Sequence, residues 1–228
     1  MGYFIEPPVQ PSVKVKGGGL FPVRRIFCIG RNYADHVREM GGDPKANPPV
    51  FFTKPADAVV ANGTAIPYAL ATQNLHFEGE LVVALKSGGA NLSAENVQDA
   101  IFGFAAGCDL TRRDHQARAK NAGAPWDTAK GFDHSAPVGE IVPADAVANQ
   151  LSNSRLFTFI NGEKRQDAPL SSMIWPINEI IVALSEQFEL KAGDLIFTGT
   201  PEGVGPVVKG DKIRVEIGPL TLEFKIAP

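Results

Sequence analysis

Short apolar runs bounded by glycine, proline or asparagine recur along the chain, and this pattern predicts strands. The clearest runs cover residues 24–30, 50–54, 79–86, 101–108, 156–160, 194–198, 212–217 and 220–226. Asn161-Gly162 is typical of a tight hairpin turn, and Gly218-Pro219 joins the last two runs into a second hairpin. Strands outnumber helices and many are joined by tight turns, so we expect a β-rich α+β fold with a few helices.

Only a few segments have the periodicity of a helix. Residues 173–188 carry one apolar stripe, formed by Ile177, Ile180, Ile181, Leu184 and Phe188. Pro176 is expected in the first turn of that helix, where a missing N–H costs little.

Three more helices are predicted from their ends. Thr111 and Asp114 have the spacing of a capping box and predict a helix over 112–122 that ends at Gly123. A short helix is expected from Ser93 to Ala100. Asn32 is expected to cap another over residues 33–40.

The first 22 residues are expected to form a loose N-terminal arm, because they contain Pro7-Pro8, Pro11 and Gly17-Gly18-Gly19. Residues 23–228 are expected to form a single domain. Residues 32–48 hold a short helix between glycines and prolines, which is typical of a mobile lid. An ordinary surface helix remains an alternative for this segment.

Net charge and cysteine usage indicate which partners and which cellular compartment to expect. The net charge of −3 over 228 residues argues against nucleic acid or an anionic membrane surface as a partner. No apolar stretch is long enough to span a bilayer, and the N-terminus lacks the pattern of a signal peptide. Cys28 and Cys108 lie in apolar runs and are expected to be reduced, which fits a cytoplasmic protein.

Carboxylates stand at the ends of two neighbouring apolar runs. Glu78 and Glu80 are two residues apart at the head of one strand, so their side chains point to the same face. Asp109 ends the second run. If these strands are neighbours, three oxygen ligands converge, a set that Mg²⁺ or Mn²⁺ prefers. Solvated glutamates at a strand start remain the alternative.

Other polar residues are candidates for chemistry. His36 and Glu39 share a helix face, and Gln116 falls in the first turn of the 112–122 helix. Lys130 lies between apolar neighbours, which predicts an ammonium directed inward. Each also has an ordinary interpretation as a solvated side chain. The loop 199–205 lacks the lysine-serine pair of a phosphate-binding loop, but its amides and the Thr200 hydroxyl are suited to holding a carboxylate.

Together these motifs resemble the fumarylacetoacetate hydrolase family from about residue 24 to the C-terminus. The segments that carry the resemblance are 30–36 with 39–40, 52–55, 76–81, 109–116, 130–133, 193–194 and 198–205. Residues 125–127 and 167–175 are similar to the small bacterial members that cleave fumarylpyruvate. One departure is Phe77, where many relatives carry a second histidine. Its loss removes a polar group beside the carboxylates.

The resemblance implies a mixed β-sandwich roll with a few peripheral helices, usually a homodimer. It implies Mg²⁺ or Mn²⁺ held by Glu78, Glu80 and Asp109. It assigns catalysis to His36 and Glu39 on a lid and to Lys130 at the oxyanion. Positions that match residues near the metal or substrate are Arg113, Gln116 and Thr200.

The expected reaction is metal-dependent hydrolysis of the carbon–carbon bond of a 2,4-dioxo acid in aromatic catabolism, most simply fumarylpyruvate to fumarate and pyruvate. In this hypothesis His36, oriented by Glu39, takes a proton from water, and Lys130 with Gln116 stabilises the developing oxyanion. Oxaloacetate decarboxylation, or hydration or isomerisation of a related 2-oxo acid, remains an alternative on the same site. A non-enzymatic metal-binding protein is a more remote one.

Overall fold

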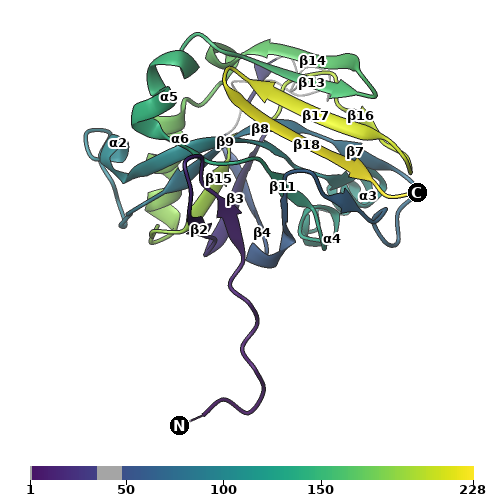
Figure 1. The fold of residues 1–228 in the computed structure, drawn as a ribbon, viewed down its shortest axis with the longest axis horizontal. Helices are drawn as coiled ribbons and strands as arrows, with labels where there is room; N and C mark the ends of the chain where they lie inside the picture. The colour runs from purple at the N-terminus through teal and green to yellow at the C-terminus, as the bar shows by residue number, and fades with distance from the viewer. Residues whose placement is uncertain (1, 35–47) are drawn as a thin grey trace.

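The structure is a computed structural model that describes residues 2–34 and 48–228. Residues 2–11 are irregular, and the segment before Gln10 extends away from the body as a tail (Figure 1). The predicted loose arm is wrong for 12–22, because β1 (Ser12–Lys14) and β2 (Leu20–Pro22) pair antiparallel. Val13 and Phe21 are buried in a core cluster, and their burial holds this hairpin against the body.

The larger of two main sheets contains eight strands in the order β4-β3-β15-β8-β9-β11-β5, with β12 pairing to β9. Their bounds are β3 Arg25–Gly30, β4 Val50–Lys54, β5 Val59–Ala61, β8 Gly79–Leu85, β9 Ile101–Cys108, β11 Ala136–Val138, β12 Val142–Pro143 and β15 Asp194–Phe197. Pairing is mixed, since β15 runs parallel to β3 and antiparallel to β8. The predicted apolar runs 24–30, 79–86, 101–108 and 194–198 therefore form the centre of this sheet.

Strand β8 is buried along its whole length because both faces of the sheet are covered. Leu81, Val83 and Leu85 enter the main core, whereas Val82 and Ala84 enter the second core on the other face. Alternate side chains of a strand point to opposite faces, so an uninterrupted apolar run is what this position requires.

The second main sheet, in the order β14-β13-β17-β18-β6, lies over the first (Figure 1). Its bounds are β6 Ala65–Ile66, β13 Arg155–Ile160, β14 Glu163–Pro169, β17 Lys212–Ile217 and β18 Leu220–Ile226. Both predicted hairpins are confirmed, and Asn161 and Gly162 have the positive φ values, 53° and 88°, that a tight hairpin turn needs. Buried and exposed residues alternate strictly along β18, as in a half-buried sheet.

A small third sheet and short helices complete the β-rich sandwich. The sheet contains β10 (Thr111–Arg112), β7 (Leu75–Phe77) and β16 (Gly205–Pro206) in that order. The helices are α2 Val97–Ala100, α3 Arg113–Ala122, α4 Asp127–Lys130, α5 Ala144–Leu151 and α6 Ile177–Gln187, with 3-10 turns η1 Ala56–Ala58 and η2 Leu170–Ser172. The predicted helix over 33–40 extends beyond the described residues.

Helix ends differ from several predictions. Helix α3 ends at Gly123 in the left-handed conformation as expected, but the capping box is wrong: no side chain caps its N-terminus. Asp114 instead accepts hydrogen bonds from the Thr72 hydroxyl and the Gln73 amide. Helix α6 begins at Ile177, so Pro176 precedes its first turn, and α2 begins four residues after Ser93.

Both cysteines are buried free thiols, as predicted. Among the described helices, none is both long and apolar enough to cross a bilayer.

The packing between β8, β9 and β15 predicts a strong effect of one methyl group. A Cβ at Gly107 would lie 2.4 Å from Val82 Cγ2 and 2.9 Å from Phe197 Cε1. We expect Gly107→Ala to lower the free energy of unfolding by about 1–3 kcal/mol, because overpacking a core forces side chains to shift. Urea unfolding measures the change.

Gly205→Ala is the matched control, because its Cβ would approach Phe77 no closer than 3.5 Å, an ordinary contact. Its effect should stay within about 0.5 kcal/mol. Equal effects of the two substitutions would show that close packing at Gly107 does not limit stability.

Candidate metal and active site

The three predicted carboxylates converge, and all three are buried. Glu78 lies between β7 and β8, Glu80 belongs to β8 and Asp109 follows β9. Strands β8 and β9 pair antiparallel with Glu80 opposite Gly107, and the Asp109 amide donates to the Glu78 carbonyl at 2.8 Å. One oxygen from each carboxylate lies within 4.8 Å of the others. Since none is more than 5% exposed, the alternative of solvated glutamates does not hold.

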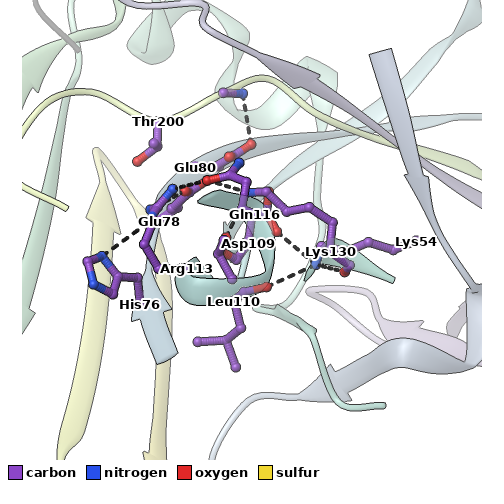
Figure 2. A network of polar contacts seen from close by, with 12 residues as sticks. Lys54, His76, Glu78, Glu80, Asp109, Leu110, Arg113, Gln116, Lys130 and Thr200 are labelled. Atoms are coloured by element: carbon purple, nitrogen blue, oxygen red, sulfur yellow. Dashed lines mark hydrogen bonds and ion pairs between the residues drawn. The ribbon is translucent and has the colours of Figure 1, made fainter. Parts of the chain in front are cut away.

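Lys130 bridges two of these carboxylates, and its burial confirms the predicted inward orientation (Figure 2). Its Nζ lies 2.7 Å from Glu78 Oε2 and 2.6 Å from Asp109 Oδ2, and it donates to Thr111 Oγ1 at 2.7 Å. Burial by itself would lower the pKa of Lys130, but Asp109 and Glu78 outweigh it and raise that pKa. The ammonium is therefore held charged by the carboxylates.

A second buried lysine, Lys54 at the end of β4, supports the same cluster from behind. Its Nζ lies 2.7 Å from Asp109 Oδ1 and donates to the carbonyls of Leu110 and Lys130. These bonds fix the backbone on both sides of the carboxylates. Asp109 is thus enclosed by two ammonium groups, which offsets much of the cost of burying its charge.

Arg113 opens helix α3 and connects Glu78 to the pocket wall. Its Nη2 lies 2.6 Å from Glu78 Oε1, and its Nη1 donates to Gln116 Oε1 at 2.5 Å. Its Nε lies 3.3 Å from His76 Nδ1, while His76 Nε2 lies 2.8 Å from Asn74 Oδ1. Burial, and then repulsion from Arg113, lowers the pKa of His76 to about 4. A neutral ring with its proton on Nε2 satisfies both contacts.

Glu80 differs from its two neighbours because it makes no ion pair with another described residue. Its Oε2 accepts a hydrogen bond from the Gly199 amide at 2.7 Å. Burial, and then repulsion from Asp109 and Glu78, raises the pKa of Glu80 well above its usual value. A divalent cation among the three carboxylates would relieve this repulsion and provide a positively charged partner for Glu80. Three clustered oxygen donors fit Mg²⁺ or Mn²⁺.

Six of the predicted site residues line one pocket next to this cluster: Glu78, Glu80, Arg113, Gln116, Lys130 and Thr200. Asp109 is fully buried beside them. The fold thus brings together site residues that the sequence analysis had assigned separately, from β8 and the residue before it, α3, α4 and the loop after β15. His36 and Glu39 lie outside the described residues.

The Thr200 hydroxyl is engaged by the protein itself. It donates to the Gly79 carbonyl at 2.8 Å and accepts from Gln166 Nε2 at 2.8 Å. Gln166 Oε1 also accepts from the Gly79 amide. In this arrangement Thr200 fastens its loop to β8, and its single O–H is not directed to a ligand.

Several supporting residues were not predicted, namely Lys54, His76 and Gln166. A lysine that ends an apolar strand before a proline was a usable signal for Lys54. No local sequence signal marks Gln166, because its partners Gly79 and Thr200 reach it only when β14 packs on β8. Phe77, the departure from the family pattern, is buried in the main core rather than facing the site.

The comparisons with known proteins agree with this geometry. The fumarylacetoacetate hydrolase C-terminal family model matches residues 25–227. The chain belongs to the fumarylacetoacetate hydrolase family. It is 41% identical to oxaloacetate tautomerase FAHD1 of Bos taurus over 89% of this chain and 91% of that protein. It is 42% identical to fumarylpyruvate hydrolase of Ralstonia sp over 73% and 86%.

A solved structure shares the fold closely. Fumarylpyruvate hydrolase from Pseudomonas aeruginosa, in complex with Mn²⁺ and pyruvate, superposes with a TM-score of 0.95. It is 41% identical to this chain, and the match covers 99% of both chains. The mixed β-sandwich predicted from the sequence is therefore the family fold.

Neutralising Glu80 tests whether the cluster accepts a cation. Because the folded state raises the pKa of Glu80, its ionised form opposes folding at neutral pH, and Glu80→Gln should raise the thermal midpoint of the chelated protein. Wild type should gain about 2.7 kcal/mol at a Mn²⁺ or Mg²⁺ concentration one hundred times the Kd. The variant should lose most of this gain.

Thermal unfolding with chelator and then with added cation measures both effects. The exposed Glu140 provides the control variant Glu140→Gln, which should respond to the cation like wild type. An undiminished response of Glu80→Gln would exclude Glu80 as a ligand.

Proposed function

We propose that this protein hydrolyses the carbon–carbon bond of a 2,4-dioxo acid in aromatic catabolism, with fumarylpyruvate as substrate and fumarate and pyruvate as products. The observation that carries this proposal is the cluster of three buried carboxylates beside a pocket that also exposes donors for a substrate. The similarity to fumarylpyruvate hydrolase of Ralstonia sp, and to the Pseudomonas aeruginosa enzyme in complex with Mn²⁺ and pyruvate, adds support. We infer an enzyme that uses Mg²⁺ or Mn²⁺.

Glu78, Glu80 and Asp109 would hold the cation. When bound, it supplies a Lewis acid for the 2-oxo acid end of the substrate. The carboxylates are prepared for this task because the fixed β8–β9 pairing holds two of them, and Lys130 and Lys54 hold the third. Such preorganisation avoids a reorganisation cost during the reaction.

Donors for the substrate come from α3 and α4. Arg113 Nη1 fixes Gln116 Oε1, so the Gln116 amide nitrogen is the end of that side chain left to donate into the pocket. Lys130 uses its three N–H groups on Glu78, Asp109 and Thr111. To stabilise an oxyanion it must release one of these bonds, which is easier once the carboxylates have another partner.

Hydrolysis also requires a base that removes a proton from water. We propose His36, oriented by Glu39, for this role because an imidazole has a pKa near neutrality. The hydroxide attacks the distal carbonyl, the carbon–carbon bond breaks, and the carbon that leaves takes up a proton to give pyruvate. A lid over residues 32–48 would couple closure to this step. We also propose a homodimer, as the family resemblance implies.

A second candidate is oxaloacetate tautomerisation, which the 41% identity to the Bos taurus tautomerase favours. Oxaloacetate is likewise a 2-oxo acid whose oxygens suit a divalent cation. Tautomerisation only moves a proton between carbon and oxygen, so no water has to attack. The two activities therefore differ in their need for a water-activating base.

Removal of the proposed base separates these candidates. We expect wild type with Mg²⁺ to cleave fumarylpyruvate with a higher kcat/KM than it tautomerises oxaloacetate, and chelator to abolish both. His36→Ala should lower kcat for fumarylpyruvate by about 10²–10⁴-fold, the usual contribution of a general base, while the cation still stabilises the folded protein. Ultraviolet absorbance of the two substrates follows both reactions.

Glu80→Ala is the contrasting variant, since it should lose the stabilisation by cation together with turnover. If oxaloacetate is the better substrate and His36→Ala still converts it, the hydrolase proposal is wrong and the tautomerase takes its place.

A further inference from the structure

Arg31 and Lys120 line the candidate pocket, and within residues 2–34 and 48–228 neither has an anionic partner. The other two cations of the wall, Arg113 and Lys130, are neutralised by Glu78 and Asp109. Among the side chains that the structure describes, Arg31 and Lys120 therefore give this part of the pocket an excess of positive charge.

The backbone presents Arg31 at a strained position. It directly follows β3 and has φ = 62°, a left-handed conformation that a residue with a Cβ rarely adopts. The neighbouring Asn32 is fully buried and stabilises this turn: its side chain donates to the carbonyls of Trp175 and Thr198 and accepts from the Trp175 amide. Strain held by such anchoring is typical of functional positions.

Lys120 belongs to the stripe of α3 that faces the pocket. Arg113, Gln116 and Lys120 are spaced three and four residues apart, so they share one helix face. Lys120 lies two turns beyond Arg113, a rise of about 10 Å along the axis. Burial, and then repulsion from Arg31 and Arg113, lowers the pKa of Lys120. An anion between Arg31 and Lys120 would remove that repulsion.

Apolar side chains line the same pocket. Ile29, Phe52 and Trp126 contribute to its wall, and the rings of Phe52 and Trp126 pack with centroids 5.8 Å apart. This surface suits the uncharged middle of a carbon chain. The pocket thus combines a site for a 2-oxo acid, an apolar wall and the two cations Arg31 and Lys120.

We propose that Arg31 and Lys120 bind a second carboxylate at the far end of the substrate and so select dicarboxylic 2-oxo acids over those with an uncharged tail. This inference deepens the proposed function, on which it rests. In fumarylpyruvate the two carboxylates stand at opposite ends of a seven-carbon chain. Both products of its hydrolysis would then leave as carboxylates, one from each end of the pocket.

A pair of unreactive ligands tests this selection separately from hydrolysis. 2-Oxoheptanedioate and 2-oxoheptanoate have the same length and differ only in the distal carboxylate. With Mg²⁺ present, calorimetry should show wild type binding the diacid at least about tenfold more tightly, because a hydrogen bond to a charged group contributes about 1.5–3 kcal/mol. Arg31→Met and Lys120→Met should each remove most of this preference and leave affinity for the monoacid unchanged.

Arg118→Met is the matched control, because Arg118 is an exposed cation on the same helix that does not line the pocket. It should retain the preference of wild type. Equal affinity of wild type for the two ligands, binding of neither, or a preference unchanged in both pocket variants would overturn the inference. Failure of the proposed hydrolysis would appear separately, as an absence of fumarylpyruvate cleavage by a wild type that still prefers the diacid.

Discussion

The burial of three carboxylates at one end of the β8–β9 pair is the constraint on which the site depends. Isolated buried charges are very costly, so each must have a partner. Lys130 pairs with Glu78 and Asp109, Lys54 with Asp109, and Arg113 with Glu78. Among the described residues, Glu80 receives a hydrogen bond only from the Gly199 amide. Glu78 and Asp109 thus have positively charged partners and Glu80 has none in the described part of the chain. This difference indicates that a cation binds beside Glu80.

The rest of the fold holds these charges in place. Two core clusters cover the faces of the large sheet and fix β8 and β9 in register. Short segments then bring in the partners: β4 delivers Lys54, α4 delivers Lys130, and α3 presents a stripe of polar side chains. The loop after β15 is fastened to β8 through Thr200 and Gln166. Rigid elements thus set the positions of groups that come from distant parts of the sequence.

Local patterns in the sequence predicted the long strands of both main sheets and the convergence of the carboxylates, but not the short strands such as β1, β7 and β16. Strand periodicity placed Glu78 and Glu80 on one face, and the end of the next strand placed Asp109 beside them. Features that depend on tertiary partners were missed. Thr111 does not cap α3, because its hydroxyl donates to the Asp109 carbonyl and accepts from Lys130. The role of Lys54 depends on Leu110 and Asp109, more than fifty residues further along the chain.

We propose that Glu78, Glu80 and Asp109 jointly bind one divalent cation. Crystals grown with Mn²⁺ test it most directly, through anomalous scattering recorded at the manganese absorption edge. Joint binding predicts one strong anomalous peak within direct coordination distance of an oxygen from each of the three side chains. A peak elsewhere, or well-ordered carboxylates paired only with lysine and arginine in the presence of Mn²⁺, would contradict it.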